Sequence, residues 1–85
     1  MINEVAQRIA LCKKEKSTTL NLSGLGLSSI PEEVGELVWL EKLDLDNNQI
    51  QTIQGLDNLA QLSWLDLDNN QIQSLNGLDL VVVKV

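Results

Sequence analysis

Hydrophobic and polar positions repeat along this chain with a period of 22 residues. Residues 43–51 read LDLDNNQIQ, and residues 65–73 read the same nine letters. Over Leu43–Asp46 leucine alternates with aspartate, a period of two that is typical of a short strand with one buried face. The apolar residues that follow are more widely spaced, at Ile50, Ile53, Leu56 and Leu59. A segment of this kind has to turn several corners, and it buries its apolar face only when neighbouring coils stack.

Each repeat carries an asparagine at the same point, Asn48 in one and Asn70 in the other. Corners of the chain leave backbone N–H and C=O groups that need partners when they are buried. An asparagine side chain offers two donors and an acceptor. We therefore predict that Asn48 and Asn70 are structural residues.

The wider pattern L-x-x-L-x-L-x-x-N-x-I-x-x-[IL] begins at Leu40 and again at Leu62. It resembles the leucine-rich repeat, and its 22-residue step resembles the variety in phosphatase-regulatory and internalin-type proteins. Residues 2–31 also resemble the opening of bacterial and cyanobacterial leucine-rich repeat domains, including those of Roco-type GTPases. The phosphate-binding motif G-x-x-x-x-G-K-[ST] is absent from the sequence, so no GTPase activity carries over.

The resemblance implies an α/β fold: a short right-handed solenoid with a parallel three-stranded sheet and an N-terminal capping helix. It also implies a non-catalytic recognition module rather than an enzyme. We expect a single domain over residues 1–85. Its parts are the capping helix at 1–16, a degenerate first repeat at 17–39, a second repeat at 40–61, a third repeat at 62–83 and an uncapped tail to residue 85.

An amphipathic helix is predicted from Asn3 to about Lys14. One helical stripe holds Ile2, Val5, Ile9 and Cys12. Asn3 is suited to the N-cap, whereas Leu11 lies off the stripe. We expect this helix to cover the open end of the first coil and Cys12 to be a small buried residue. The alternative is a basic helix that docks on another molecule.

Composition excludes several kinds of chemistry. The chain has one cysteine and no histidine, so an intramolecular disulfide, a histidine-based triad and a Cys/His metal site are all excluded. We predict no cofactor. The longest early apolar run, Ile9–Cys12, is too short for a signal peptide, and no segment has the length of a membrane span. These features predict a cytoplasmic protein.

Charge is distributed unevenly. The net charge is −6, and from residue 17 onward ten acidic residues face only Lys42 and Lys84. Nucleic acids and anionic membranes are bound through lysine and arginine, so we expect neither as a partner. The expected partner is a protein or peptide of basic character.

Alternation within the strands predicts which side chains leave the core on the concave side of the sheet. We name six of them the acidic sheet face: Lys42, Asp44, Asp46, Trp64, Asp66 and Asp68. Four carboxylates suit a cationic partner, and an exposed tryptophan is a frequent anchor at interfaces. We predict partner binding here; the alternative is a solvated acidic surface that maintains solubility.

Aspartates such as those of the acidic sheet face can also bind a metal ion or act in catalysis. Asp44-x-Asp46-x-Asn48 imitates the start of a calcium-binding EF-hand loop, but the glycine and glutamate needed at its sixth and twelfth positions are replaced by Gln49 and Gly55. We therefore predict no metal site. Carboxylate pairs on an open sheet, with no other catalytic group nearby, do not predict an enzyme.

The carboxyl end of the sequence is rich in branched apolar residues. We predict self-association through Leu78, Leu80, Val81, Val82, Val83 and Val85. An uncovered strand edge invites a second chain, and a two-fold contact closes on itself, so a homodimer is expected. Two alternatives stay open: a tail that folds back as its own cap, and a chain that is a piece of a longer repeat array. A self-assembling unit without a separate ligand is the alternative function.

Overall fold

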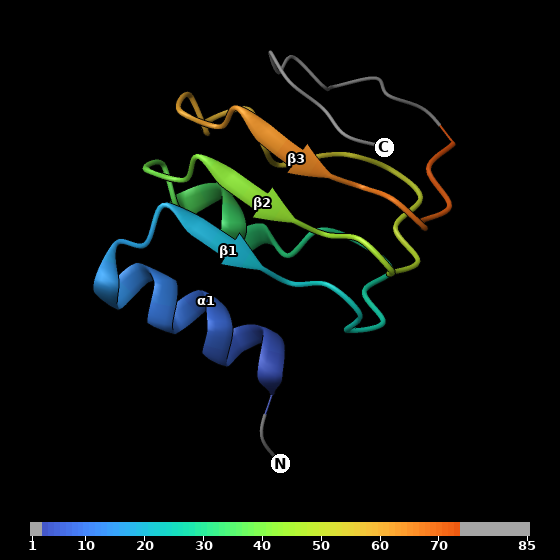
Figure 1. Ribbon diagram of the computed structural model, residues 1–85, viewed down its shortest axis with the longest axis horizontal. Coiled ribbons are helices and arrows are strands. Elements are labelled where there is room, and N and C mark those ends of the chain that lie inside the picture. Colours follow the sequence, from blue (N-terminus) through green and yellow to red (C-terminus); the bar gives the residue numbers. More distant parts are fainter. Residues whose placement is uncertain (1–2, 74–85) are drawn as a thin grey trace.

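The computed structural model describes residues 3–73 and consists of one α-helix followed by a parallel sheet (Figure 1). The elements in chain order are α1 (Glu4–Glu15), β1 (Thr19–Asn21), the short 3₁₀-helix η1 (Glu32–Glu36), β2 (Lys42–Asp44) and β3 (Trp64–Asp66). The strand order is β1-β2-β3, so strands that follow one another along the chain are neighbours in the sheet. The predicted α/β class, with a helix before three parallel strands, is confirmed.

Each strand pairs with the next so that equivalent positions of the repeat lie opposite one another. Leu20 lies opposite Leu43, and Leu43 lies opposite Leu65. Backbone hydrogen bonds continue this register beyond the strands, with Leu45 N donating to Asp66 O at 2.9 Å and Asn47 N donating to Asp68 O at 2.9 Å. Equivalent residues of successive repeats therefore form straight columns across the sheet.

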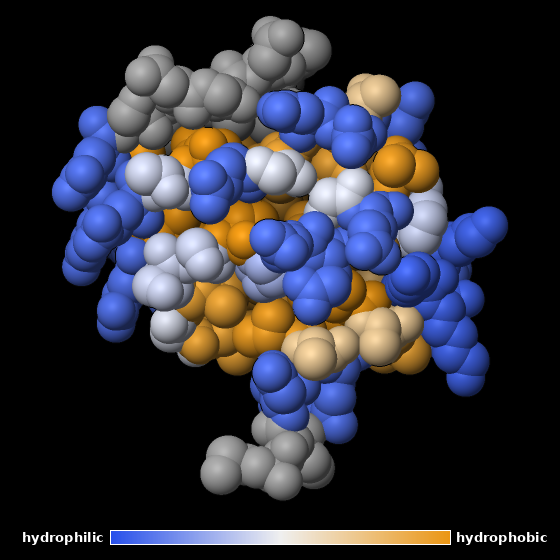
Figure 2. Space-filling view, turned by 180° about the vertical axis from the view of Figure 1, so that it is seen from behind, coloured by the Kyte–Doolittle hydropathy of each residue, from blue (hydrophilic) through white to orange (hydrophobic). Residues whose placement is uncertain are grey.

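The leucine positions of the repeat line one shared interior. Leu43 and Leu65 are fully buried, as are Leu22, Leu37, Leu40, Leu45 and Ile50. Ile9 and Cys12 bring one side of α1 into the same cluster. Burial raises the pKa of the Cys12 thiol, which donates a hydrogen bond to Ser17 O at 3.3 Å. On the side of the molecule opposite to the view of Figure 1, hydrophobic surface is visible between hydrophilic residues (Figure 2).

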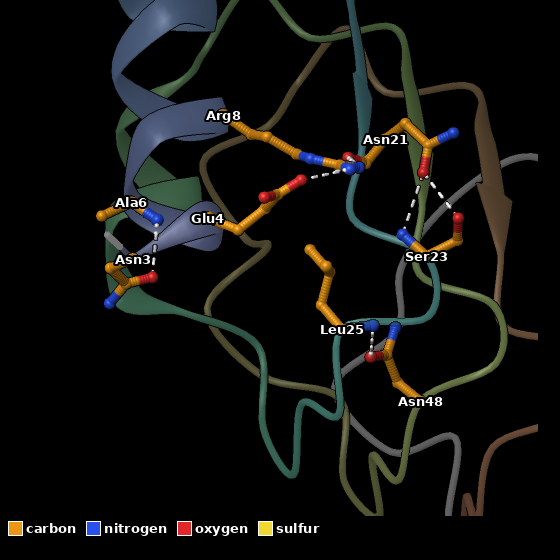
Figure 3. Close-up of polar contacts among 8 residues, drawn as sticks. All are labelled: Asn3, Glu4, Ala6, Arg8, Asn21, Ser23, Leu25 and Asn48. Carbon is orange, nitrogen blue, oxygen red and sulfur yellow. Dashed lines mark hydrogen bonds and ion pairs between the residues drawn. The ribbon is translucent and has the colours of Figure 1, made fainter. Parts of the chain in front are cut away.

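The predicted helix is found with its predicted N-cap. Asn3 Oδ1 accepts a hydrogen bond from Ala6 N at 3.1 Å, and the helix ends where Lys16 takes a left-handed conformation with φ 50°. Arg8 reaches from α1 to β1 and donates to Asn21 O at 2.9 Å (Figure 3). Leu11, which lies off the apolar stripe, is 54% exposed.

After each strand the chain turns a tight corner at a residue with a positive φ angle. Asn47 and Asn69 take positive φ angles of 57° and 59°, a conformation that asparagine tolerates better than most residues. In the first repeat Gly24 occupies the equivalent position with φ 64°. This corner turns the next residue, Asn48, toward the interior, where it is 7% exposed.

Asn48 joins the backbones of two repeats. Its Oδ1 accepts from Leu25 N at 3.1 Å (Figure 3). The same oxygen accepts from Leu27 N at 2.9 Å. Its Nδ2 donates to Leu22 O, Leu45 O and Asp46 O. Asn70 makes a similar set one repeat later, accepting from Ile50 N at 2.9 Å and donating to three carbonyls. Backbone groups left open by each corner are thus paired with asparagine side chains.

Candidate functional site

The acidic sheet face takes its arrangement from the register of β2 and β3. Lys42 lies opposite Trp64, and Asp44 lies opposite Asp66. Asp46 and Asp68 follow the carboxyl ends of these strands. There the hydrogen bond from Asn47 N to Asp68 O keeps the two segments in register. Because the strands are parallel, all four aspartates gather at one end of the sheet.

Exposure differs among the six residues. Lys42 is exposed, while Asp44, Asp46, Trp64 and Asp68 are partly buried. Asp66 is only 6% exposed and is the most buried of the six. Its Oδ1 accepts a hydrogen bond from Asp68 N at 3.0 Å, which folds the side chain against its own backbone.

A short side-chain turn of this kind closes the end of every strand. Asp44 Oδ1 accepts from Asp46 N at 3.1 Å, as Asp66 Oδ1 does from Asp68 N. In β1 an asparagine does the same, with Asn21 Oδ1 accepting from Ser23 N at 2.9 Å (Figure 3). Asp and Asn side chains commonly bond to the backbone two residues on. This role was not predicted from the sequence, although the D-x-D spacing in both repeats indicates it.

Three carboxylates of this face crowd together. Oxygen atoms of Asp44, Asp46 and Asp66 all lie within 4.8 Å of one another. Asp46 Oδ2 accepts from Asn47 Nδ2 at 3.1 Å, but Asp46 Oδ1 is buried and finds no hydrogen-bond donor within residues 3–73. The hydrogen bond that a protonated Asp46 shares with Asp44, burial, and the negative charges of Asp44 and Asp66 together raise the pKa of Asp46 to about 6.

The same three side chains are the group in the described part of the chain that could offer oxygen ligands to a cation. A calcium ion takes six to eight oxygen ligands, which is about twice what three single carboxylate oxygens supply. Asn48, third in the EF-hand-like series, is turned to the interior and bonded to backbone. The arrangement of these residues is therefore not that of an EF-hand loop.

A hollow of about 240 Å³ lies at the other end of the face, lined by Thr19, Leu20, Asn21, Lys42, Asp44 and Trp64. It is smaller than the roughly 300–1,000 Å³ of a typical small-molecule site. The hollow has room for one side chain of a partner, with the Trp64 ring as an apolar wall and Asp44 as an acceptor. Together the hollow and the aspartates form a surface suited to contact with another chain.

The predicted self-association residues, Leu78, Leu80, Val81, Val82, Val83 and Val85, lie outside the described residues. Homodimer formation and an uncapped carboxyl end stay predictions. The boundaries of the three predicted repeats also stay predictions.

Comparison with known proteins identifies the class to which this fold and surface belong. The family model described as "Leucine rich repeat" matches residues 17–72. The match covers more than half of the chain, and the protein therefore belongs to the leucine-rich repeat family. A search of curated proteins found no match. Leucine-rich repeat domains generally mediate protein–protein interactions and are usually not enzymes. Within residues 3–73, no helix is long and apolar enough to cross a membrane.

Proposed function

We propose that this protein is a non-catalytic protein-interaction module that binds a basic protein or peptide through the acidic sheet face. The observation that carries the proposal is the gathering of Asp44, Asp46 and Asp66 at one end of the sheet, where their oxygens lie within 4.8 Å of one another. Carboxylates that lie so close repel one another, and a lysine or arginine from a partner relieves that repulsion.

The charges around the face support a cationic partner. The ion pairs that occur within residues 3–73, Glu4–Arg8 and Lys13–Glu36, both involve α1 and include none of these three aspartates. Lys42 is at the opposite end of β2, beside Trp64. A partner with lysine or arginine for the aspartates and an apolar side chain for the Trp64 hollow fits the surface.

Binding of a labelled hexalysine peptide, measured by fluorescence anisotropy at about 0.15 M salt, where the Debye length is about 8 Å, tests the proposal. The double variant Asp44→Asn/Asp66→Asn removes two charges and keeps the side-chain oxygens that accept from Asp46 N and Asp68 N. We expect this variant to bind hexalysine about tenfold more weakly, a loss of roughly 1.4 kcal/mol.

A matched control changes the net charge equally at another place. Glu32 and Asp57 are both exposed and lie outside the acidic sheet face. The variant Glu32→Gln/Asp57→Asn should change the affinity less than about twofold, because exposed charges far from the contact are screened by salt. Equal losses in the two double variants would show attraction to the net charge alone and would contradict a site at the sheet.

The remaining features of the architecture are part of the same proposal. We infer that the repeats form a short right-handed solenoid whose concave side carries the acidic sheet face, with α1 as an N-terminal cap. The straight columns of equivalent residues and the burial of Ile9 and Cys12 against the sheet support this inference. The composition supports a cytoplasmic location, and the apolar residues within the stretch 78–85 support a homodimer as the alternative function.

A further inference from the structure

Among the aspartates of residues 3–73, Asp46 has the surroundings least suited to a negative charge. Its Oδ1 is buried and has no donor among the residues that the structure describes, although the Oδ2 of the same carboxylate accepts from Asn47. One carboxylate oxygen of Asp46 lies within 4.8 Å of an oxygen of Asp44 and an oxygen of Asp66. A buried carboxylate oxygen without a donor is unfavourable, since it has lost water and gained no hydrogen bond, and the two neighbouring carboxylates add repulsion.

A proton on this group removes both penalties at once. It turns one acceptor into a donor, so that Asp46 can hydrogen-bond to Asp44, and it removes one of three adjacent negative charges. We propose that Asp44, Asp46 and Asp66 share a bound proton in mildly acidic solution, and that its loss toward neutral pH strengthens the binding of basic partners. This inference rests on the proposed function and adds a pH-dependent control to the same surface.

The groups around Asp46 agree with this assignment. Asp44 and, farther away, Lys42 lie on β2, which Asp46 follows; on the β3 side lie Asp66 and Asp68. On the β1 side the equivalent positions are Asn21 and Ser23, which carry no charge. Arg8, the cation that α1 brings to β1, is bonded to Glu4 and to the Asn21 carbonyl. The acids closest to Asp46 therefore outweigh any nearby cation.

The raised pKa of Asp46 determines how this group changes the stability of the fold with pH. The pKa of Asp46 is raised to about 6 from an ordinary value of 3.8, so the folded chain holds the proton more tightly than the unfolded chain. This group therefore favours the folded state at low pH, and its contribution is lost as the pH rises from about 4 to about 6. The negative charge of Asp46 itself appears around pH 6, mostly between about pH 5 and pH 7.

Carbon-detected NMR of the aspartate side-chain carboxyls tests the proton directly, without any partner. We expect one aspartate of the wild-type chain to titrate with a midpoint near pH 6, and this transition to be missing in Asp46→Asn. The exposed Asp57→Asn variant, which makes the same chemical change elsewhere, should keep the transition. The proposal is overturned if every aspartate of the wild-type chain titrates below about pH 5.

Hexalysine binding at about pH 5 and pH 7.5 tests the consequence for function. We expect wild-type affinity to be about five times higher at pH 7.5, and the Asp46→Asn variant to lose most of this difference, while Asp57→Asn keeps it. Equal wild-type affinities at the two pH values would overturn the pH control. If the titration near pH 6 is observed but hexalysine does not bind at either pH, the shared proton stands and the proposed function fails.

Discussion

At the scale of single residues, the asparagine pairs that follow β2 and β3 shape the corners of the chain and bond to the backbone around them. Asn48 accepts two backbone N–H groups from the preceding repeat and donates to three carbonyls of two repeats. Asn47, just before it, takes the left-handed conformation that turns Asn48 inward. The two asparagines of each pair therefore have different roles. The first turns the corner, and the second forms hydrogen bonds to the backbone around it.

Replacing Asn48 with alanine should lower the free energy of unfolding by at least about 3 kcal/mol, because several buried backbone groups lose their partners. Asn70→Ala should cost less, since the Asn70 side chain is only partly buried and accepts one N–H rather than two. Urea denaturation followed by tryptophan fluorescence measures both losses. Gln49→Ala, at an exposed neighbouring position, is the control and should change stability by less than about 0.5 kcal/mol. A loss below 1 kcal/mol for Asn48→Ala would contradict the assigned role.

At the scale of elements, the segments that lead from one strand to the next, here called return segments, come into close contact at Gly35 and Gly55. Gly35 lies in η1, where a Cβ atom added to it would be 2.8 Å from the carbonyl oxygen of Gly55. That oxygen belongs to the backbone of the next repeat and cannot rotate away as a side chain can. The absence of a side chain at Gly35 thus sets the spacing between two return segments.

The variant Gly35→Ala should therefore lower the free energy of unfolding by about 1–2 kcal/mol. Alanine has the opposite effect where it fits, because it reduces the conformational freedom of the unfolded chain and stabilises the protein by about 0.4–1 kcal/mol. The sign of the change in a urea denaturation experiment decides between these outcomes. Unchanged or increased stability would mean that Gly35 and Gly55 are not in close contact.

The elements themselves were largely predictable from the sequence. Periodic leucines predicted the strands that pair through Leu20, Leu43 and Leu65, and an N-cap residue followed by an apolar stripe predicted α1. Local patterns of this kind depend on residues close in sequence and on which side of a strand faces the core.

Details of the acidic sheet face were not predictable in the same way. Alternation gives the side of the sheet on which Asp66 lies. It does not predict that the Asp66 side chain accepts a hydrogen bond from Asp68 N or that the residue is only 6% exposed. The crowding of Asp46 with Asp44 and Asp66 depends on the distance between neighbouring strands and on side-chain rotamers. Both depend on tertiary packing, which the local pattern of residues along the sequence does not reveal.

At the scale of the whole molecule, repetition turns a local feature into a surface. An aspartate pair in one repeat is an ordinary turn device, but stacking in register brings the pairs of two repeats together. The net charge of −6 favours basic partners in general, whereas these aspartates lie on the same face as the Trp64 hollow and select that face. A second acidic group, Glu32, Glu33 and Glu36, lies on η1 and offers a competing surface.

The central claim is that a basic partner contacts the acidic sheet face, and amide chemical-shift mapping with hexalysine tests it most directly. A ¹⁵N-labelled chain should show its largest shift changes at residues 42–46 and 64–68, with little change over α1 and η1. Shift changes centred on Glu32–Glu36, or spread evenly over all acidic residues, would contradict the account.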